Sequence, residues 1–414
     1  MIIMKKIIVV GGGAAGMIAA IFAAKTNENA NVTLIEKNEK LGKKIYITGK
    51  GRCNLTNFCD KSEFVKNVVR NPKFVIGSIY SFSPQELYDF FEENGLRLKV
   101  ERGNRVFPVS DKASDVTKTL EKLLDKYSVC VKLNERVESL NIVRDKICGV
   151  QTDLNSYDCD SVIVCTGGVS YPLTGSTGDG YVFANSAGHN ITEIKPSLVG
   201  MELYGENYRD LQGLSLKNVK ITFYINGKSV YEDFGEMLFT HFGVSGPVIL
   251  SCSCNVNRLD LSKAILSIDL KPALTEKQLD ERLIREFALS KNQALLSAMR
   301  SLLPKSLVPA VITEANVPFE KKCAEISKQE RKALVYALKH FSFKVKGLRP
   351  VEEAIVTSGG VNVSEVSPKT MESKLIKGLY FAGEVLDVDC YTGGYNLQTA
   401  FSTGRSAGIA AASD

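Results

Sequence analysis

The chain has 414 residues, of which 44% are hydrophobic and 24% are charged, and 52 basic against 46 acidic residues give a net charge of +6. This length exceeds one ordinary hydrophobic core, so two or three domains are expected. Because no apolar run approaches the roughly 20 residues that cross a bilayer and residues 1–10 lack a signal-peptide cleavage site, a cytoplasmic protein is expected. Basic residues are spread along the chain, so we expect no nucleic-acid partner.

Residues 7–36 predict a dinucleotide-binding βαβ unit. An apolar strand runs into Gly11, Gly13 and Gly16, an alanine-rich helix follows, and a second strand ends in Glu36. The first glycine permits the tight turn, the second lets backbone approach a pyrophosphate, and the third lets the helix pack against the strand. The helix N-terminus favours phosphate, and the carboxylate of Glu36 can accept hydrogen bonds from a ribose diol.

Helices and strands continue to alternate in the N-terminal part, which is typical of an α/β domain with a parallel sheet. One helix is predicted over residues 83–93 with Ser83 as its N-cap, and another over residues 114–127 with Ser114 in the cap position. Residues 161–168 form a continuous apolar strand that runs into a glycine pair, as buried parallel strands do.

The pattern changes near Pro196. Period-two alternation over residues 197–262 predicts antiparallel sheet, and Asn226-Gly227 within it predicts a hairpin turn. Helical periodicity over residues 275–302 and 327–340 predicts a helical subdomain, after which strands and glycine turns return. The simplest architecture is a nucleotide-binding domain interrupted by a β domain. The boundaries are residues 1–195 and 352–414 for the Rossmann-like domain, 196–270 and 341–351 for the inserted β domain, and 271–340 for the helical subdomain.

A second strand-to-helix glycine turn near the end of the chain favours one dinucleotide. A strand over residues 379–382 ends at Gly383-Glu384, and Gly393-Gly394 opens the last helix. A nicotinamide dinucleotide needs the first turn and its sheet neighbours, whereas the ribityl chain and ring system of FAD extend to a second set of backbone groups. A site built from both chain ends therefore favours FAD.

The ten cysteines are scattered, and none forms a C-x-x-C motif. Cys252 and Cys254 are spaced to point the same way along a predicted strand. With only three histidines in the chain, we expect no metal site, and we expect free thiols rather than a redox-active disulfide.

Four strings carry a resemblance to a known family: TGKGRCNLTN (48–57), STGDGYVFANSAG (176–188), GEMLFTHFGVSGP (235–247) and FAGEVLDVDCYTGGYNLQTAFSTGRSAG (381–408). Over essentially its full length the chain resembles the YhiN/BaiN-like flavoproteins, whose members are often labelled aminoacetone oxidase family FAD-binding enzymes or NAD(P)/FAD-dependent oxidoreductases. The resemblance implies a Rossmann-like FAD domain of the glutathione-reductase type, interrupted by an antiparallel β-barrel-like domain with a helical subdomain.

The resemblance also implies the residues that contact FAD. It places Glu36 on the adenosine ribose, Lys37 and Lys44 on the adenosine side, and Glu384 on the ribityl chain. The last helix N-terminus would stabilise the negative charge of reduced flavin. The expected contacts are Gly11, Gly13, Ala14, Ala15, Gly16, Glu36, Lys37, Lys44, Arg52, Cys53, Asn54, Val137, Thr166, Gly167, Gly383, Glu384, Gly394, Tyr395, Asn396 and Leu397. Cys390 departs from the small residue expected at its position.

Three side chains are candidates for catalysis. His241 lies in a loop that the family motif places beside the cofactor domain, although a histidine hydrogen-bonded in a turn explains it equally well. Tyr171 follows a glycine pair and could direct its hydroxyl into the cleft, and Tyr395 flanks the last glycine pair; packing is the alternative for Tyr171. Asp387 and Asp389 better fit a capping or linking role.

The expected function is that of a cytoplasmic FAD-dependent oxidoreductase. Hydride would pass between the flavin and a small hydrophobic ketone or enone, steroid-like by the resemblance, bound between the FAD domain and the inserted domain. No second G-x-G-x-x-G exists, so NAD(P)H as a transient co-substrate, another donor and O₂ all stay open. The alternatives are a flavin-free NAD-dependent dehydrogenase and an FAD-containing RNA-modifying or RNA-binding protein, for which a pI of 8.6 is weak support.

Overall fold

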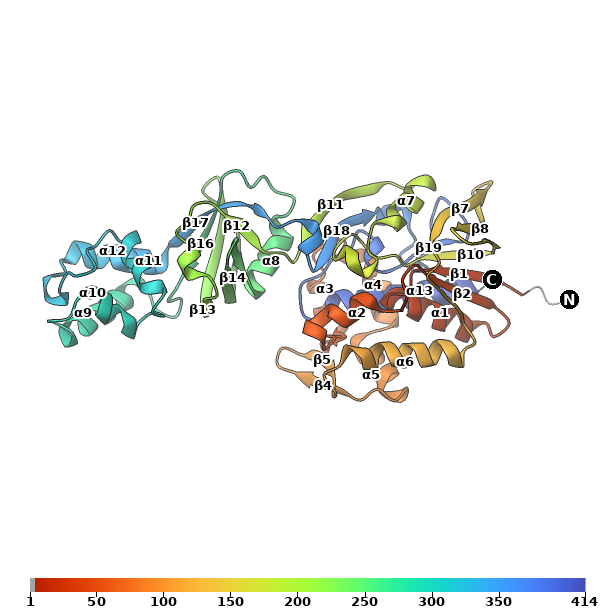
Figure 1. Ribbon diagram of the computed structural model, residues 1–414, viewed down its shortest axis with the longest axis horizontal. Coiled ribbons are helices and arrows are strands. Elements are labelled where there is room, and N and C mark those ends of the chain that lie inside the picture. The colour runs from red at the N-terminus through yellow and green to blue at the C-terminus, as the bar shows by residue number, and fades with distance from the viewer. Residues whose placement is uncertain (1–3, 414) are drawn as a thin grey trace. The chain divides into compact units, whose positions relative to one another are not determined.

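The computed structural model describes residues 4–413, and the chain divides into two compact units. Unit 1 comprises Met1–Ser197 and Val351–Asp414, and unit 2 comprises Leu198–Pro350. Figure 1 shows the red N-terminal and blue C-terminal segments interleaved within unit 1, while the green segments form unit 2. Two parts of the chain about 200 residues apart therefore build one domain.

A five-stranded parallel sheet with the order β19-β10-β1-β2-β6 forms the centre of unit 1. Its strands are rich in branched aliphatic residues and largely buried, as expected for a parallel sheet covered on both faces. The predicted Rossmann-like α/β domain is confirmed. The strands are β1 (Lys6–Val10), β2 (Asn31–Glu36), β6 (Cys130–Leu133), β10 (Ser161–Val164) and β19 (Leu379–Phe381).

Two helices from opposite ends of the chain, α1 (Ala14–Thr26) and α13 (Tyr395–Ala412), pack side by side. Glycines make this approach so close that an added Cβ at Gly404 would lie 2.4 Å from the carbonyl oxygen of Ala15. The same atom at Gly408 would lie 2.2 Å from a carbonyl oxygen of α1. The packing therefore couples the N-terminal nucleotide turn to the C-terminal helix.

The other elements of unit 1 surround this core. The predicted capping box of Ser83 and Glu86 is present at the start of α5. The predicted cap at Ser114 is wrong: α6 begins at Ala113 after the extended Lys112, so Ser114 lies inside the first turn. The elements are α2 (Lys43–Ile47), β3 (Thr56–Asn57), α3 (Lys61–Lys66), α4 (Pro72–Ser81), α5 (Pro84–Glu93), β4 (Leu98–Glu101), β5 (Arg105–Pro108), α6 (Ala113–Lys126), β7 (Val137–Val143), β8 (Lys146–Thr152), β9 (Ser156–Asp158), α7 (Asp179–Ser186), β11 (Ile191–Ser197) and β18 (Val356–Val361).

Unit 2 contains a closed antiparallel barrel of six strands in the order β12-β15-β14-β13-β16-β17. The predicted hairpin is confirmed, because Ile225 pairs with Lys228 and both turn residues, Asn226 and Gly227, have positive φ. The strands are β12 (Met201–Leu203), β13 (Ser215–Ile225), β14 (Lys228–Thr240), β15 (Gly243–Ser245), β16 (Ala264–Asp269) and β17 (Phe341–Leu348).

One part of the predicted antiparallel region is instead helical. Residues Pro247–Val256 form α8, with proline at its first position, so Cys252 and Cys254 lie on a helix and not on a strand. The alternating Cys-Ser-Cys string suggested a period of two. Val248, Ile249, Cys252 and Val256 are buried, which is the spacing of one helix face.

The helical part of unit 2 shares one hydrophobic core with the barrel. Capping boxes at Thr275 and Ser327 begin α9 and α12, as local sequence signatures of this kind indicate. The predicted helix over residues 275–302 is broken after Leu289. The helices are α9 (Glu276–Leu289), α10 (Leu295–Ala298), α11 (Leu307–Glu314) and α12 (Lys328–Lys339). Among residues 4–413, no helix is both long and apolar enough to cross a membrane.

Candidate functional site

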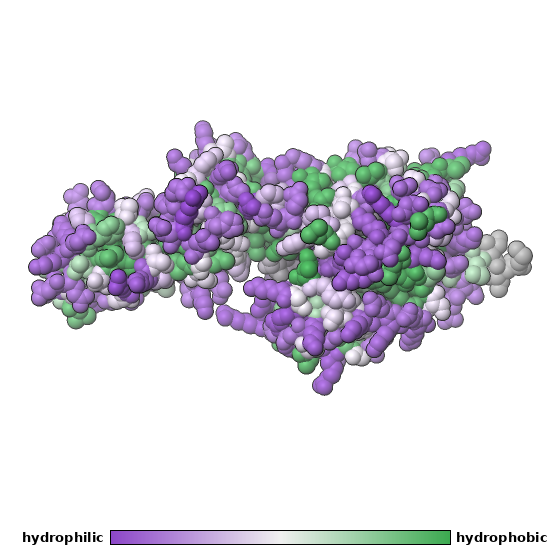
Figure 2. All heavy atoms as spheres, viewed as in Figure 1, coloured by the Kyte–Doolittle hydropathy of each residue, from purple (hydrophilic) through white to green (hydrophobic). Residues whose placement is uncertain are grey.

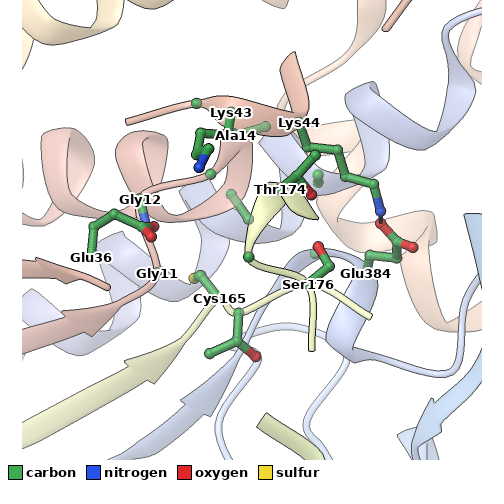
Figure 3. Close-up of a pocket in the computed structure, with 18 of the residues that line it drawn as sticks. Gly11, Gly12, Ala14, Glu36, Lys43, Lys44, Cys165, Thr174, Ser176 and Glu384 are labelled. Atoms are coloured by element: carbon green, nitrogen blue, oxygen red, sulfur yellow. Dashed lines mark hydrogen bonds and ion pairs between the residues drawn. The ribbon is translucent and has the colours of Figure 1, made fainter. Parts of the chain in front are cut away.

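A cavity of about 1340 Å³, measured with its opening, lies in unit 1 where β1 ends at the glycine turn. This is the carboxyl edge of the parallel sheet, where open α/β sheets bind ligands. The walls come from both ends of the chain and from the segments that follow β2 and β10 (Figure 3). The predicted contacts that line it are Gly11, Gly13, Ala14, Ala15, Glu36, Lys37, Lys44, Val137, Thr166, Gly167, Gly383, Glu384, Asn396 and Leu397.

The glycine turn presents backbone to this cavity. Gly11 has φ of +102°, and an added Cβ there would lie 2.6 Å from a carbonyl oxygen at the end of β10. At Gly13 an added Cβ would meet no atom within 4 Å, so backbone is open to a ligand at that position. Gly16 does not line the cavity but permits helix packing, since its Cβ would lie 1.8 Å from the carbonyl oxygen of Gly11. No side chain caps α1, and its first-turn residues Ala14 and Ala15 line the cavity.

The carboxylate of Glu36 is fixed at one end of the cavity. Its Oε2 accepts a hydrogen bond of 2.7 Å from the Gly12 N–H, and its Oε1 accepts from the Asn38 N–H at 2.8 Å. Glu36 is 8% exposed, and Figure 3 shows it beside Gly12. A carboxylate has about four acceptor positions, so capacity remains for two ribose hydroxyls.

Lys37 lies in the same part of the site, and its charge is balanced within the protein. Its Nζ is 2.7 Å from the carboxylate of Asp179, which also accepts from Arg136 at 3.0 Å. Burial alone would raise the pKa of Asp179, but Lys37 and Arg136 hold it below its usual value. Asp179 and Arg136 line the cavity although they were not among the predicted contacts. The TGDG string at residues 177–180 was the available signal for Asp179.

A second charged pair lies toward the C-terminal half of the cavity. Lys44 Nζ is 2.6 Å from Glu384 Oε2, and the other oxygen of Glu384 accepts from the Ser170 hydroxyl at 2.8 Å and the Thr357 N–H at 2.9 Å. Burial opposes ionisation, yet Lys44 and these hydrogen bonds lower the pKa of Glu384. The prediction put Lys44 on the adenosine side; the structure puts it beside Glu384, across the cavity from Glu36 (Figure 3).

Three predicted contacts in the 48–57 loop do not line the cavity. The Arg52 guanidinium lies over the Phe107 ring at 4.1 Å and pairs with Glu101 and Asp111. Cys53 is fully buried, and neither it nor Asn54 reaches the cavity lining. The physical reason is local: Gly49 and Lys50 both have left-handed backbone, which turns the loop away after Thr48.

The candidate catalytic residues are separated by the fold. The Tyr395 ring packs edge-on against Phe64 at 5.1 Å, burial raises its pKa, and neither Tyr395 nor Gly394 lines the cavity. Tyr171 is 36% exposed at the start of a short 3-10 turn (Pro172–Thr174) whose last residue does line it. His241 belongs to unit 2, in the exposed turn between β14 and β15. Their catalytic roles stay predictions.

Two residues between the catalytic candidates and the cavity are structural in this fold. Cys390 is fully buried, with its Sγ 3.5 Å from the hydroxyl of Thr399. Asp389 is also buried and accepts a hydrogen bond of 2.6 Å from Ser197, the last residue before the chain enters unit 2. This agrees with the linking role predicted for that aspartate.

The residues present fit a dinucleotide held at two ends. The Thr166 hydroxyl is buried at the cavity and has no hydrogen-bond partner among the described residues, as a group awaiting a ligand would be. The N-termini of α1 and α13 both reach the cavity without a side-chain cap. They can therefore hold a pyrophosphate at one end and a second electronegative edge at the other.

Comparison with known proteins identifies the fold and its relatives. Residues 5–410 match the family model described as HI0933-like protein Rossmann domain. The 3-dehydro-bile acid Δ(4,6)-reductase of Clostridium scindens is 31% identical over 411 residues, which cover 99% of each chain. The ribosomal RNA dihydrouridine synthase of Haemophilus influenzae is 33% identical over 400 residues, 96% of each chain. A 3-ketosteroid Δ4-(5α)-dehydrogenase from Rhodococcus jostii has a similar fold, with a TM-score of 0.53 and 14% identity over 99% of this chain and 97% of that one.

Proposed function

The chain belongs to the HI0933-like Rossmann-domain family and is an FAD-binding oxidoreductase, and on that premise we propose that it reduces a carbon–carbon double bond conjugated to a carbonyl group. The observation that carries the proposal is the cavity that both chain ends line, with uncapped helix N-termini from α1 and α13. The cofactor is FAD, so the flavin-free dehydrogenase is excluded.

The names of two relatives support the bond type. A Δ(4,6)-reductase of a 3-dehydro-bile acid acts on double bonds that extend from a ketone, and a dihydrouridine synthase acts on a uracil double bond that is conjugated to a ring carbonyl. In each case a hydride adds to the carbon β to the carbonyl and a proton adds to the α carbon. One reaction class therefore accounts for both activities.

Bound FAD supplies the hydride, and the protein's own residues must hold the cofactor and provide the proton. Glu36 would bind the adenosine ribose, and the Lys44–Glu384 pair would bind the ribityl chain. The first-turn N–H groups of Asn396 and Leu397 would stabilise negative charge on the flavin edge that they face. His241 and Tyr171 are the proposed proton donors.

An anaerobic absorbance titration tests the reaction class. NADPH or NADH, which we propose as donors, should bleach the flavin band, and an α,β-unsaturated ketone should restore it, whereas the corresponding saturated ketone should not. Reoxidation by the saturated ketone at the same rate would contradict the proposal. If neither nicotinamide bleaches the flavin but dithionite does, the donor assignment fails while the enone half-reaction can still be measured.

The distribution of charge favours a second candidate, in which the conjugated double bond is that of a uracil in RNA. Residues 198–350 hold 22 basic and 16 acidic side chains, whereas the rest of the chain holds 30 of each. The whole excess of +6 therefore belongs to unit 2, whose visible face is largely hydrophilic (Figure 2). Localised positive charge supplies the salt-dependent affinity of proteins for phosphate backbones.

Nucleoside analysis separates the two candidates. Ribosomal RNA from a strain that lacks this gene should lose one dihydrouridine, detected by mass spectrometry of the digested RNA, and the purified protein with a flavin reductant should restore it. Unchanged dihydrouridine in the deletion strain would remove the RNA candidate and leave the small enone.

A further inference from the structure

A second, larger groove lies at the opposite edge of the parallel sheet in unit 1. It has a volume of about 2520 Å³ with its opening, and it shares no lining residue with the cofactor cavity. Lys5, Ser161 and Gly378 line it, and they stand at the amino ends of β1, β10 and β19. The other walls come from α4, from the loop that contains Pro368, and from the last turns of α13.

The groove is strongly basic although unit 1 as a whole is neutral. Six cationic side chains line it, against the two carboxylates of Asp160 and Glu372. Both carboxylates already accept backbone hydrogen bonds, Asp160 from the Lys6 N–H at 2.8 Å and Glu372 from the Gly378 N–H at 2.9 Å. Within residues 4–413 none of the six cations forms an ion pair. They are Lys5, Lys73, Lys146, Lys369, Lys377 and Arg405.

Arg405 is built into the wall of this groove. Its guanidinium lies over the rings of Phe22 and Phe82, at 5.0 and 5.3 Å from their centroids, and its Nη1 donates to the Ser81 carbonyl at 3.1 Å. Its Nε is buried and has no partner among the described residues. A guanidinium has five donors in a rigid fork, so most of them remain for an anion.

We propose that this basic groove, defined by the six cations above, binds the phosphate backbone of RNA. The proposal rests on the RNA candidate for the proposed function and adds a binding surface on unit 1. The cations come from five separate segments along an open groove, which suits charges spread along a chain better than one compact phosphate. Tyr380 is 6% exposed and cannot stack on a base, so the contact would be independent of RNA sequence.

The test compares two triple variants of the FAD-loaded protein. Lys73→Gln with Lys369→Gln and Lys377→Gln removes three exposed groove charges. The matched control, Lys118→Gln with Lys122→Gln and Lys126→Gln, removes three exposed charges from α6. Binding of a labelled single-stranded RNA of about 20 nucleotides is followed by fluorescence anisotropy at roughly 50 to 200 mM salt.

The groove variant should bind the RNA at least about tenfold more weakly, and its dependence of log Kd on log salt should flatten by about 2, since each lost phosphate contact in a single strand removes about 0.7. The control should keep most of the wild-type affinity and slope. Equal losses in both variants, or wild-type binding by the groove variant, would overturn the proposal. Normal flavin spectra and thermal unfolding exclude misfolding as the cause.

The outcome is separable from that of the proposed function. If the wild-type protein forms dihydrouridine and the groove variant binds RNA normally, the groove proposal fails alone. If the groove variant alone loses RNA binding and no uracil is reduced, the groove proposal stands and the RNA substrate fails.

Discussion

Replacing Gly404 by alanine should weaken FAD binding, because this glycine is where α13 contacts the first turn of α1. The added Cβ would lie 2.4 Å from the Ala15 carbonyl oxygen and 3.0 Å from its Cα. Both are backbone atoms, which cannot rotate away as a side chain can. The helices must therefore separate by roughly 1 Å, and Ala15 lines the cavity at the end of α1.

The expected magnitude follows from two opposing terms. Overpacking of a close contact costs about 1–3 kcal/mol, and a clash with backbone belongs in the upper half of that range. Alanine regains about 1 kcal/mol over glycine in a helix interior, so the free energy of unfolding should fall by about 1–2 kcal/mol. Displacing one N–H from a phosphate costs about 1.5–3 kcal/mol, which weakens FAD binding by about 10- to 100-fold.

Gly408→Ala is the matched control. Its Cβ would lie 2.2 Å from the Ala19 carbonyl oxygen, one turn further from the cavity, so the loss of stability should be similar and the loss of FAD affinity smaller. Thermal unfolding gives the first quantity, and fluorescence titration of the apoprotein with FAD gives the second. Equal FAD affinity in the two variants would refute the coupling of this contact to the site.

Three further predictions follow from the charged groups. Glu36→Gln should weaken FAD binding about tenfold, because an amide cannot accept hydrogen bonds at both of its polar atoms; titration of the apoprotein with FAD measures it, and unchanged affinity would argue against a ribose contact. Lys44→Met leaves the buried Glu384 without its cation, so thermal stability should drop by about 2 kcal/mol at pH 7 and recover toward pH 5; adding Glu384→Gln should remove that pH dependence. Burial lowers the pKa of His189 while Glu365 opposes this, so the unfolded chain binds a proton first and stability should fall as pH drops below about 6.5. His189→Gln should flatten that part of the stability profile, and an unaltered profile would exclude this histidine.

Local sequence rules predicted elements well where a segment's neighbours in sequence decide its conformation. Ser83 and Glu86 cap α5 reciprocally, and Asn226-Gly227 closes the hairpin, because both depend on atoms a few residues apart. They failed for α8, where the Cys252-Ser-Cys254 alternation concealed a helical set of buried positions that only the neighbouring barrel reveals.

The sequence by itself determined that both ends of the chain build one dinucleotide site, because glycines at 11–16 and 393–394 are required wherever backbone must approach a ligand or another helix closely. Tertiary structure decided which side chains face that site. Arg52 is drawn to Glu101 and Asp111, whereas Lys44 pairs with Glu384, 340 residues away in sequence. Ion pairs are set by where folding brings charges together, and no spacing within the 48–57 loop specifies the partner across the cavity.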